Sequence, residues 1–188
     1  MKPEVEQCLD HFSKRIYDIQ FVKMPESTKK KAIDIDARLC SDVLSCDSAY
    51  ATHTTEWVLA NCIWWSKNAQ EYFWDEQIYN KDKTEARTVR QRRKGYVKNG
   101  SRRVFTVEHE YPLGILKSKV INKQFESVDD VKKYLKKYNK VTVITHEENN
   151  ELRWKGLNSA TTIEEAVDRY KICGIDVVKF SENRQIIF

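Results

Sequence analysis

Glycine is scarce in this chain. Five glycines stand among 188 residues, and they are scattered singly along the sequence. A P-loop or a dinucleotide-binding fingerprint needs two or three glycines within about six residues, because the backbone there must approach phosphate groups closely. The sequence therefore argues against kinase-like and dehydrogenase chemistry that depends on such a loop.

Long apolar runs and paired cysteines are also absent. No apolar run approaches the roughly 18 residues that span a membrane, and the first ten residues, MKPEVEQCLD, lack the apolar core of a secretory signal. We expect a cytoplasmic protein without a membrane partner. The five cysteines form no CxxC pair, which is typical neither of a disulfide framework nor of a zinc ribbon. We interpret them as buried free thiols, with a cysteine nucleophile as the alternative.

Acidic residues are missing between Ala86 and Val107, although the whole chain carries 28 acidic and 33 basic residues. Residues 87–103, the basic segment, hold Arg87, Arg90, Arg92, Arg93, Lys94, Lys98, Arg102 and Arg103. A stretch of one charge is either a solvated loop or a surface that binds phosphates by releasing their counterions. Its position next to the strand described below favours phosphate binding.

Hydrophobic periodicity predicts the main elements. Helices are expected over Val5–Ile19, Lys29–Leu44 and Thr55–Gln77, from Ser127 onward, and after Thr162; strands over Arg103–Glu108, Lys140–Thr145, Ile175–Phe180 and Gln185–Phe188, with a hairpin turn at Asn99-Gly100. Ser127, Thr145 and Thr162 are each expected to cap the helix that follows, and Gly174 is expected to end the helix after Thr162.

The expected third helix is unusually aromatic. It contains Trp57, Trp64, Trp65, Tyr72, Phe73 and Trp74. These rings either fill a core between layers or form a platform on which unpaired bases stack. Because Lys67 is the sole basic residue between Trp57 and Trp74, we favour the core interpretation.

Two strands in the middle of the chain end on side chains that suit acid–base or metal chemistry. The segment VFTVEHEYP (residues 104–112) carries Glu108 and His109, and KVTVITHEENNEL (residues 140–152) carries His146 and Asn149. A strand pair followed by a helix can bring such residues to one point. A second nuclease pattern, PD-(D/E)xK, is not met, because Asp176 and Lys179 are spaced so that they fall on opposite faces of a strand.

Glu108-His109 followed by Pro112 resembles the [DE]-H-x-x-P signature that opens the HNH (His-Me finger, ββα-metal) endonuclease motif, and residues 140–152 resemble its closing strand and helix. The resemblance implies His109 as general base and Glu108 as metal ligand. It also implies a ligand on the closing helix, for which Asn149 is the first choice and the pair His146 and Asn150 the rival.

An asparagine of this motif braces the loop that holds the catalytic histidine. Asn139 is the expected counterpart here, with Asn122 as the alternative. The cation expected from the resemblance is a single divalent metal ion, Mg²⁺ first, with Mn²⁺ or Zn²⁺ as alternatives.

We therefore expect an α+β fold, with a helical N-terminal region (residues 1–80) packed on a small mixed region that contains a ββα-metal-like unit. Residues 81–188 would hold the basic segment, that unit, and a C-terminal helix with a strand pair. The expected function is a metal-dependent endonuclease of restriction or phage type that acts on DNA rather than RNA. Arg87, Arg90, Arg92, Arg93, Lys94, Arg102 and Arg103 would bind the nucleic acid, and a homodimer would suit cleavage of both strands. The alternative is a non-catalytic protein that binds nucleic acid or a protein partner.

Overall fold

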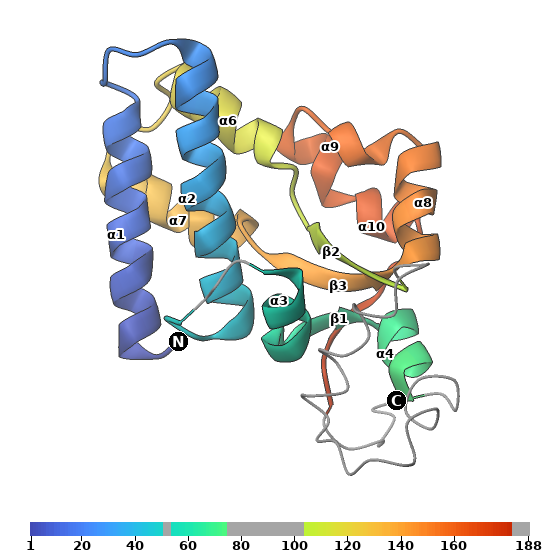
Figure 1. Cartoon of the computed structure of the whole chain (residues 1–188). Helices are drawn as coiled ribbons and strands as arrows, with labels where there is room; N and C mark the ends of the chain where they lie inside the picture. Colours follow the sequence, from blue (N-terminus) through green and yellow to red (C-terminus); the bar gives the residue numbers. More distant parts are fainter. Residues whose placement is uncertain (51–53, 75–103, 182–188) are drawn as a thin grey trace.

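The fold is α+β, as the sequence predicts. The computed structural model describes residues 1–50, 54–74 and 104–181, and Figure 1 shows helices arranged around one four-stranded sheet. The basic segment, the turn at Asn99-Gly100 and the strand expected at Gln185–Phe188 lie outside the described residues.

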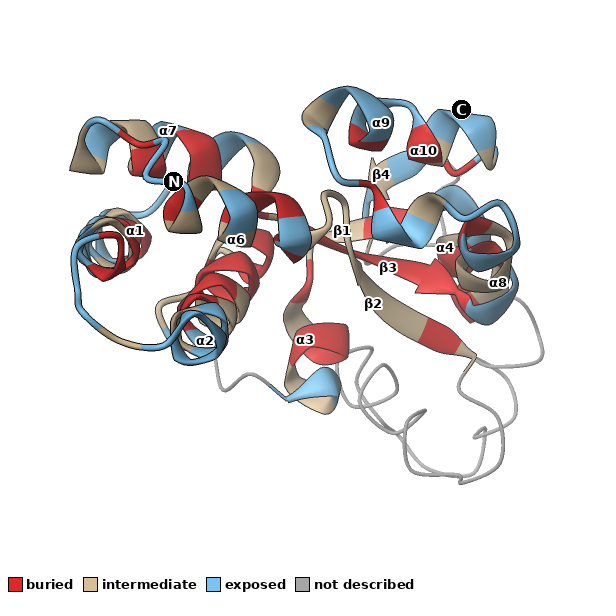
Figure 2. Cartoon of the chain, turned by 90° about the horizontal axis from the view of Figure 1, so that it is seen from above, coloured by how far each residue is buried: buried red, intermediate tan, exposed pale blue. Residues whose placement is uncertain are grey.

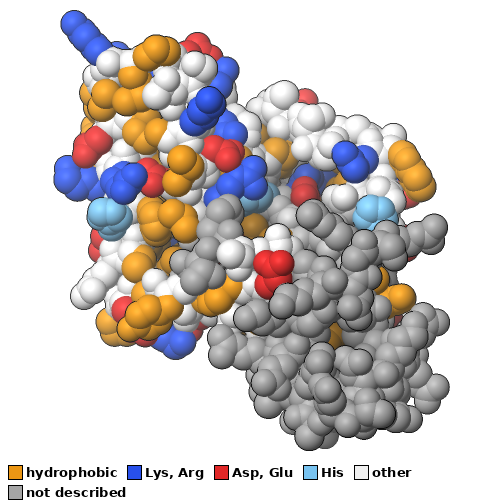
Figure 3. Space-filling model, in the orientation of Figure 1, with side chains coloured by type: hydrophobic (Ala, Val, Ile, Leu, Met, Phe, Trp, Pro, Cys, Tyr) orange, Lys and Arg blue, Asp and Glu red, His pale blue; other side chains and the backbone are white. Residues whose placement is uncertain are grey.

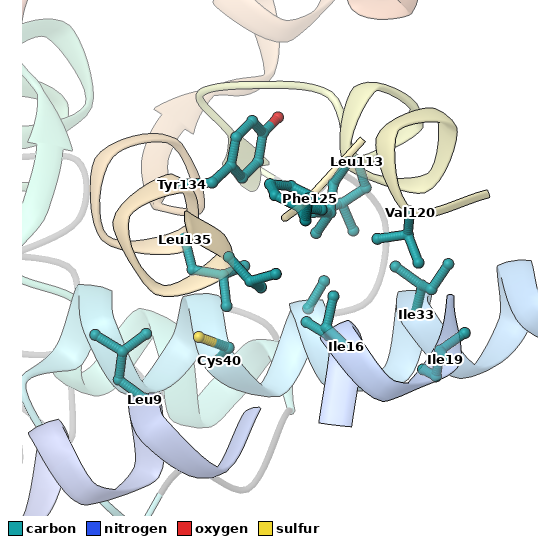
Figure 4. Packing of buried hydrophobic residues seen from close by; sticks show 13 residues of the cluster. Leu9, Ile16, Ile19, Ile33, Cys40, Leu113, Val120, Phe125, Tyr134 and Leu135 are labelled. Carbon is teal, nitrogen blue, oxygen red and sulfur yellow. The ribbon is translucent and has the colours of Figure 1, made fainter. Parts of the chain in front are cut away.

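Helices α1 (Pro3–Ile19) and α2 (Glu26–Cys46) lie side by side (Figure 1), and apolar side chains of both, among them Leu9 and Ile33, are buried in one cluster. They pack against α6 (Leu113–Ile121) and α7 (Val128–Tyr138), which come from the second half of the chain. Figure 4 shows side chains of all four helices meeting in one apolar cluster. The packing therefore does not divide at residue 80, where the expected regions meet.

The sheet has the strand order β2-β3-β1-β4. Strand β3 (Val141–Thr145) is central, pairing antiparallel with β2 (Phe105–His109) and parallel with β1 (Trp64–Ser66). Strand β4 (Val177–Lys179) pairs antiparallel with β1 at the other edge. Every residue of β3 is buried, because the strand has neighbours on both sides and helices over its faces (Figure 2).

The prediction of one helix over Thr55–Gln77 is wrong. Its place is taken by α3 (Thr55–Asn61), β1 and α4 (Lys67–Trp74). Trp65 is fully buried at the middle of β1 and contacts the rings of Phe73 and Phe105. Packing of these distant rings outweighs the local helical periodicity. Trp65, Phe73 and Trp74 are core residues, which confirms the core interpretation for them.

Four local predictions are confirmed. Ser127 caps α7, accepting a hydrogen bond from the amide of Asp130. Thr145 caps α8 (His146–Trp154) in a full capping box. Thr162 caps α9 (Ile163–Val167), and Gly174, with φ of 64°, follows the end of α10 (Arg169–Ile172). The single helix that was expected between Thr162 and Gly174 is, however, divided into α9 and α10 at Asp168.

The C-terminal helices α8, α9 and α10 lie on the side of the sheet away from α1 (Figure 2), together with a short 3₁₀ turn, η1 (Leu157–Ser159). Helix α6 was not expected from the sequence, although Leu113, Leu116 and Val120 follow a helical spacing. Among the described residues, no helix is both long and apolar enough to cross a membrane.

Candidate functional site

Glu108 and His109 line a pocket of about 530 Å³. The pocket lies between α2, the end of β2, the start of α6 and the segment around η1. Its other lining residues are Asp34, Arg38, Pro112, Leu113, Gly114, Lys117, Ser118, Asn158, Ser159, Ala160 and Thr161. This volume lies within the range of about 300–1,000 Å³ that is usual for small-ligand sites.

The local sequence places Glu108 and His109 at the point where strand becomes helix. They are the last two residues of β2, paired with Thr142 and Val141 of β3. The ladder is extended by the amide of Glu110, which donates to the carbonyl of Lys140 at 3.0 Å. Pro112 then precedes the first residue of α6 and favours a sharp change of direction. The two side chains are therefore held by rigid backbone on both sides.

Arg169 of α10 links the segment from Glu108 to Glu110, at the end of β2, to the C-terminal helices. Its guanidinium is fully buried and forms an ion pair with Glu108, with 2.9 Å between Nη2 and Oε1. It also donates to the carbonyl of Glu110 through Nε at 2.8 Å, to that of Leu157 through Nη1 at 3.2 Å, and to that of His109 through Nη2. The carbonyls of His109 and Glu110, which are consecutive in the chain, thus both accept hydrogen bonds from the same guanidinium.

Burial controls the ionisation of Glu108. Desolvation raises the pKa of this carboxyl above its ordinary value, while the charges of Arg169, Arg153 and Arg38 act in the opposite direction. The net effect is a raised pKa, because the carboxylate gives up more hydration than its partners replace.

A second ionic group forms the wall of the pocket on the α2 side. Asp34 and Arg38, one turn apart on α2, are 2.6 Å apart (Nε to Oδ2), and Lys117 of α6 approaches the other oxygen of Asp34 at 2.5 Å. Burial alone would raise the pKa of Asp34, but hydrogen bonds from Arg38 and Lys117 bring it below its ordinary value. Figure 3 shows basic and acidic side chains close together where the N-terminal helices face the C-terminal ones.

The closing helix of the expected motif lies elsewhere. In the β2–β3 ladder His109 pairs with Val141, whereas Phe105 pairs with Thr145, after which α8 begins. At a rise of about 3.3 Å per residue, the two ends of this ladder are about 13 Å apart. The amide of His146 donates to the carbonyl of Val104 at 2.8 Å, at the end remote from His109. Figure 1 shows α6 and α8 leaving the strand pair at opposite ends.

The proposed metal ligands are therefore not brought together. Neither His146 nor Asn149 nor Asn150 lines the pocket that contains Glu108 and His109. Oxygen Oε1 of Glu108 already accepts a hydrogen bond from Arg169. Within residues 1–50, 54–74 and 104–181, no three His, Cys, Asp or Glu side chains are grouped so that they could hold a metal ion. The expected donor set therefore does not fit a metal ion.

Asn139 has a structural position. It follows α7 and is buried, and its Nδ2 donates to the carbonyl of Ala37 at 2.8 Å. It thus ties the start of β3 to α2. Asn122, the alternative, follows α6 and hydrogen-bonds Ser118 of the same helix at 3.3 Å. Neither contact reaches the segment between His109 and Pro112.

No family model, curated protein or solved structure matches this chain. The candidate site is therefore described from the residues of this chain alone.

Sequence reasoning identified Glu108 and His109 but missed the charged residues around them. Asp34 and Arg38 carried a signal, since an i, i+4 pair of opposite charge marks one helix face. Lys117 and Arg169 carried none, because only the tertiary packing brings them to β2. Glu148, in the first turn of α8, was not singled out from the sequence. It is buried, and its carboxylate accepts hydrogen bonds from Ser66 (2.6 Å) and Asn68 (3.0 Å), so it joins α8 to the β1–α4 turn.

Proposed function

We propose that this protein hydrolyses phosphodiester bonds in nucleic acid, with the pocket at the end of β2 as the active site. The observation that carries the proposal is the position of His109, an acid–base side chain, in a pocket that also presents Arg38 and Lys117. DNA is the proposed substrate, in agreement with the resemblance of Glu108-His109 and Pro112 to the HNH motif.

In this proposal His109 is the general base. An imidazole titrates near neutral pH, so it can accept a proton from the water molecule that attacks phosphorus. Hydrolysis adds negative charge to the phosphate oxygens, and cations fixed beside the reacting group stabilise that charge without rearranging during the reaction. Arg38 and Lys117 are held by Asp34 in suitable positions for this role.

The requirement for a divalent ion remains a prediction from sequence. The carboxylates in the pocket are those of Glu108 and Asp34, and each is engaged by a basic side chain. The basic segment is proposed to bind the nucleic-acid backbone outside the pocket, and this role too rests on sequence alone.

Cleavage of plasmid DNA and of a structured RNA tests the proposal. Each substrate is incubated with the wild-type protein in Mg²⁺, in Mn²⁺ and in EDTA, and with His109→Ala. A matched control is His11→Ala, which removes an exposed imidazole on α1. Cleavage that persists in His11→Ala and is lost in His109→Ala is the expected result. Cleavage by both variants at the wild-type rate would show that another group, or a contaminant, is responsible.

The second candidate is a protein that binds nucleic acid or another partner without cleaving it. The ion pairs in the pocket favour it, because both carboxylates are neutralised by neighbouring cations and neither is left as an obvious ligand for a metal. Tight binding of the DNA or the RNA with no cleavage in either metal would favour this candidate and reject the hydrolase.

A further inference from the structure

Three charged side chains on α2 and α6 form a compact group on one wall of the pocket. Asp34 lies between Arg38 (2.6 Å) and Lys117 (2.5 Å), so one carboxylate holds two cations that come from different helices. The side chains of Asp34 and Lys117 are about a quarter exposed, at 26% and 25%, and that of Arg38 is 43% exposed. All three therefore remain accessible from the pocket while their positions are fixed.

The group of Asp34, Arg38 and Lys117 has an excess of positive charge, because one carboxylate holds two cations. Glu108, the other carboxylate that lines the pocket, is already paired with Arg169, which is buried and does not line it. One positive charge of the group is therefore left over at neutral pH. An anion with a single negative charge would complete the balance, and each phosphodiester of a nucleic-acid backbone carries one such charge.

Both cations also have N–H groups that can donate hydrogen bonds to a ligand. Arg38 uses Nε for Asp34, and among the described residues its two terminal nitrogens have no hydrogen-bond or ion-pair partner. A guanidinium can present these two nitrogens to two oxygens of one phosphate. Lys117 has three donors, and Asp34 is its only ion-pair partner among the described residues.

We propose that Arg38 and Lys117, held in place by Asp34, bind the phosphodiester group of the nucleic acid at which the pocket acts. This inference rests on the proposed function, because it names the residues that hold the reacting phosphate. Asp34 acts as a positioning residue: it orients both cations before the ligand arrives, which lowers the entropy lost when the phosphate binds.

Two neutral polar side chains of the pocket fit the same ligand. Ser118 of α6 and Asn158 of η1 line the pocket together with Ser159 and Thr161, whose hydroxyls already donate to Gly156 and Glu165. Ser118 and Asn158 can donate to phosphate oxygens without adding charge. The two cations supply affinity for any phosphate.

Binding is measured without cleavage, so that the inference is tested apart from hydrolysis. A fluorescein-labelled DNA duplex is titrated with protein in EDTA, and the anisotropy is followed at several salt concentrations. Arg38→Gln and Lys117→Gln each remove one cation. Matched controls are Lys31→Gln on α2 and Lys119→Gln on α6, which remove the same charge from the same helices but do not line the pocket.

Arg38→Gln and Lys117→Gln are each expected to weaken binding about tenfold, the effect of losing one charge-assisted hydrogen bond. The slope of log K against log salt should fall by about one unit in each. Arg38→Lys and Lys117→Arg, which keep the charge beside Asp34, should retain most of the affinity. Circular dichroism and thermal unfolding verify that each variant is folded.

The inference is overturned if Arg38→Gln and Lys117→Gln bind as the wild type does, or if Lys31→Gln and Lys119→Gln weaken binding equally. Its failure is distinct from failure of the hydrolase. DNA cleavage that needs His109 but has an unchanged KM in the Arg38 and Lys117 variants rejects the phosphate site alone. Binding that needs Arg38 and Lys117 without any cleavage rejects hydrolysis alone.

Discussion

The guanidinium of Arg169 is fully buried and lies 2.9 Å from the carboxylate of Glu108. This ion pair joins α10 to the end of β2. The same guanidinium donates to the carbonyls of His109, Glu110 and Leu157. One side chain thus determines how the corner that carries His109 sits against the C-terminal helices.

Replacing Arg169 with Met is expected to destabilise the protein by about 3–5 kcal/mol, because it leaves the largely buried carboxylate of Glu108 without its ion-pair partner and removes a donor from three backbone carbonyls. The free energy of unfolding in urea gives the measurement. Lys14→Met, which breaks the exposed ion pair between Lys14 and Asp18 on α1, is the control and should have little effect. In the double variant with Glu108→Gln, part of the loss should be recovered. An Arg169→Met protein as stable as Lys14→Met would contradict the structural role.

The raised pKa of Glu108 predicts a pH dependence of stability. Because burial raises the pKa of this carboxyl in the folded state, the folded protein binds the proton more tightly than the unfolded chain does. The resulting contribution to stability is complete below the ordinary value of 4.5 and is lost as the pH rises through the raised pKa.

Unfolding of the wild type and of Glu108→Gln, compared from pH 4 to pH 7, tests this sign. The wild type should lose stability relative to Glu108→Gln as the pH rises, because the glutamine does not ionise. A difference that is constant across this range would show that Arg169 just offsets the cost of burying the carboxylate, and a change in the opposite direction would show that Arg169 outweighs it.

Glu148→Ala is expected to cost about 3 kcal/mol of stability. The carboxylate accepts hydrogen bonds from Ser66 and Asn68 and from the amide of Thr145, and bonds to a buried charged group are worth about 1.5–3 kcal/mol each before relaxation. Glu147→Ala is a closely matched control, since the neighbouring residue has the same side chain but is exposed. That substitution should change stability by no more than about 0.5 kcal/mol. Equal losses in the two variants would show that Glu148 acts only through the charge of the first helical turn.

Neutralising Arg90, Arg92 and Arg93 to Gln tests the basic segment. If these side chains bind phosphates, the slope of log K against log salt should fall by about one unit for each phosphate that the variant no longer binds. The control is Lys133, Lys136 and Lys137 to Gln on α7, which removes the same charge from an exposed helix face. Identical slopes in both triple variants would mean that net charge alone governs binding.

Local patterns predicted the parts of the fold that depend on neighbouring residues. The stripes of α1 and α2, and the caps at Ser127 and Thr145, are visible in sequence because their partners lie within one or two turns. Strand β1 was missed because Trp65 is placed by rings that lie far away in the sequence, among them Phe105. A helical spacing and a short buried strand look alike there.

The candidate site likewise contains residues that the sequence indicates and residues that only tertiary packing brings together. Glu108 and His109 are adjacent in sequence and stand out as a pair, and the structure places both at one pocket. The cation that engages Glu108 lies on α10, and Lys117 lies on a helix that was not expected. Such partners follow from tertiary packing alone, so the sequence indicates the pair Glu108 and His109 but not the charged residues around it.

The strand order also bears on how the chain acquires its structure during synthesis. In the sheet Trp65 is paired with Val143 and with Val178, and both follow it at a great distance along the chain. When Trp64–Ser66 leaves the ribosome, neither of its neighbours in the sheet has yet been made. An apolar segment with its backbone donors unpaired must therefore wait for most of the remaining chain, and such delay slows folding and exposes the segment to aggregation. Helices α1 and α2, whose contacts are closer in sequence, can pair first and provide a surface on which the late strands assemble.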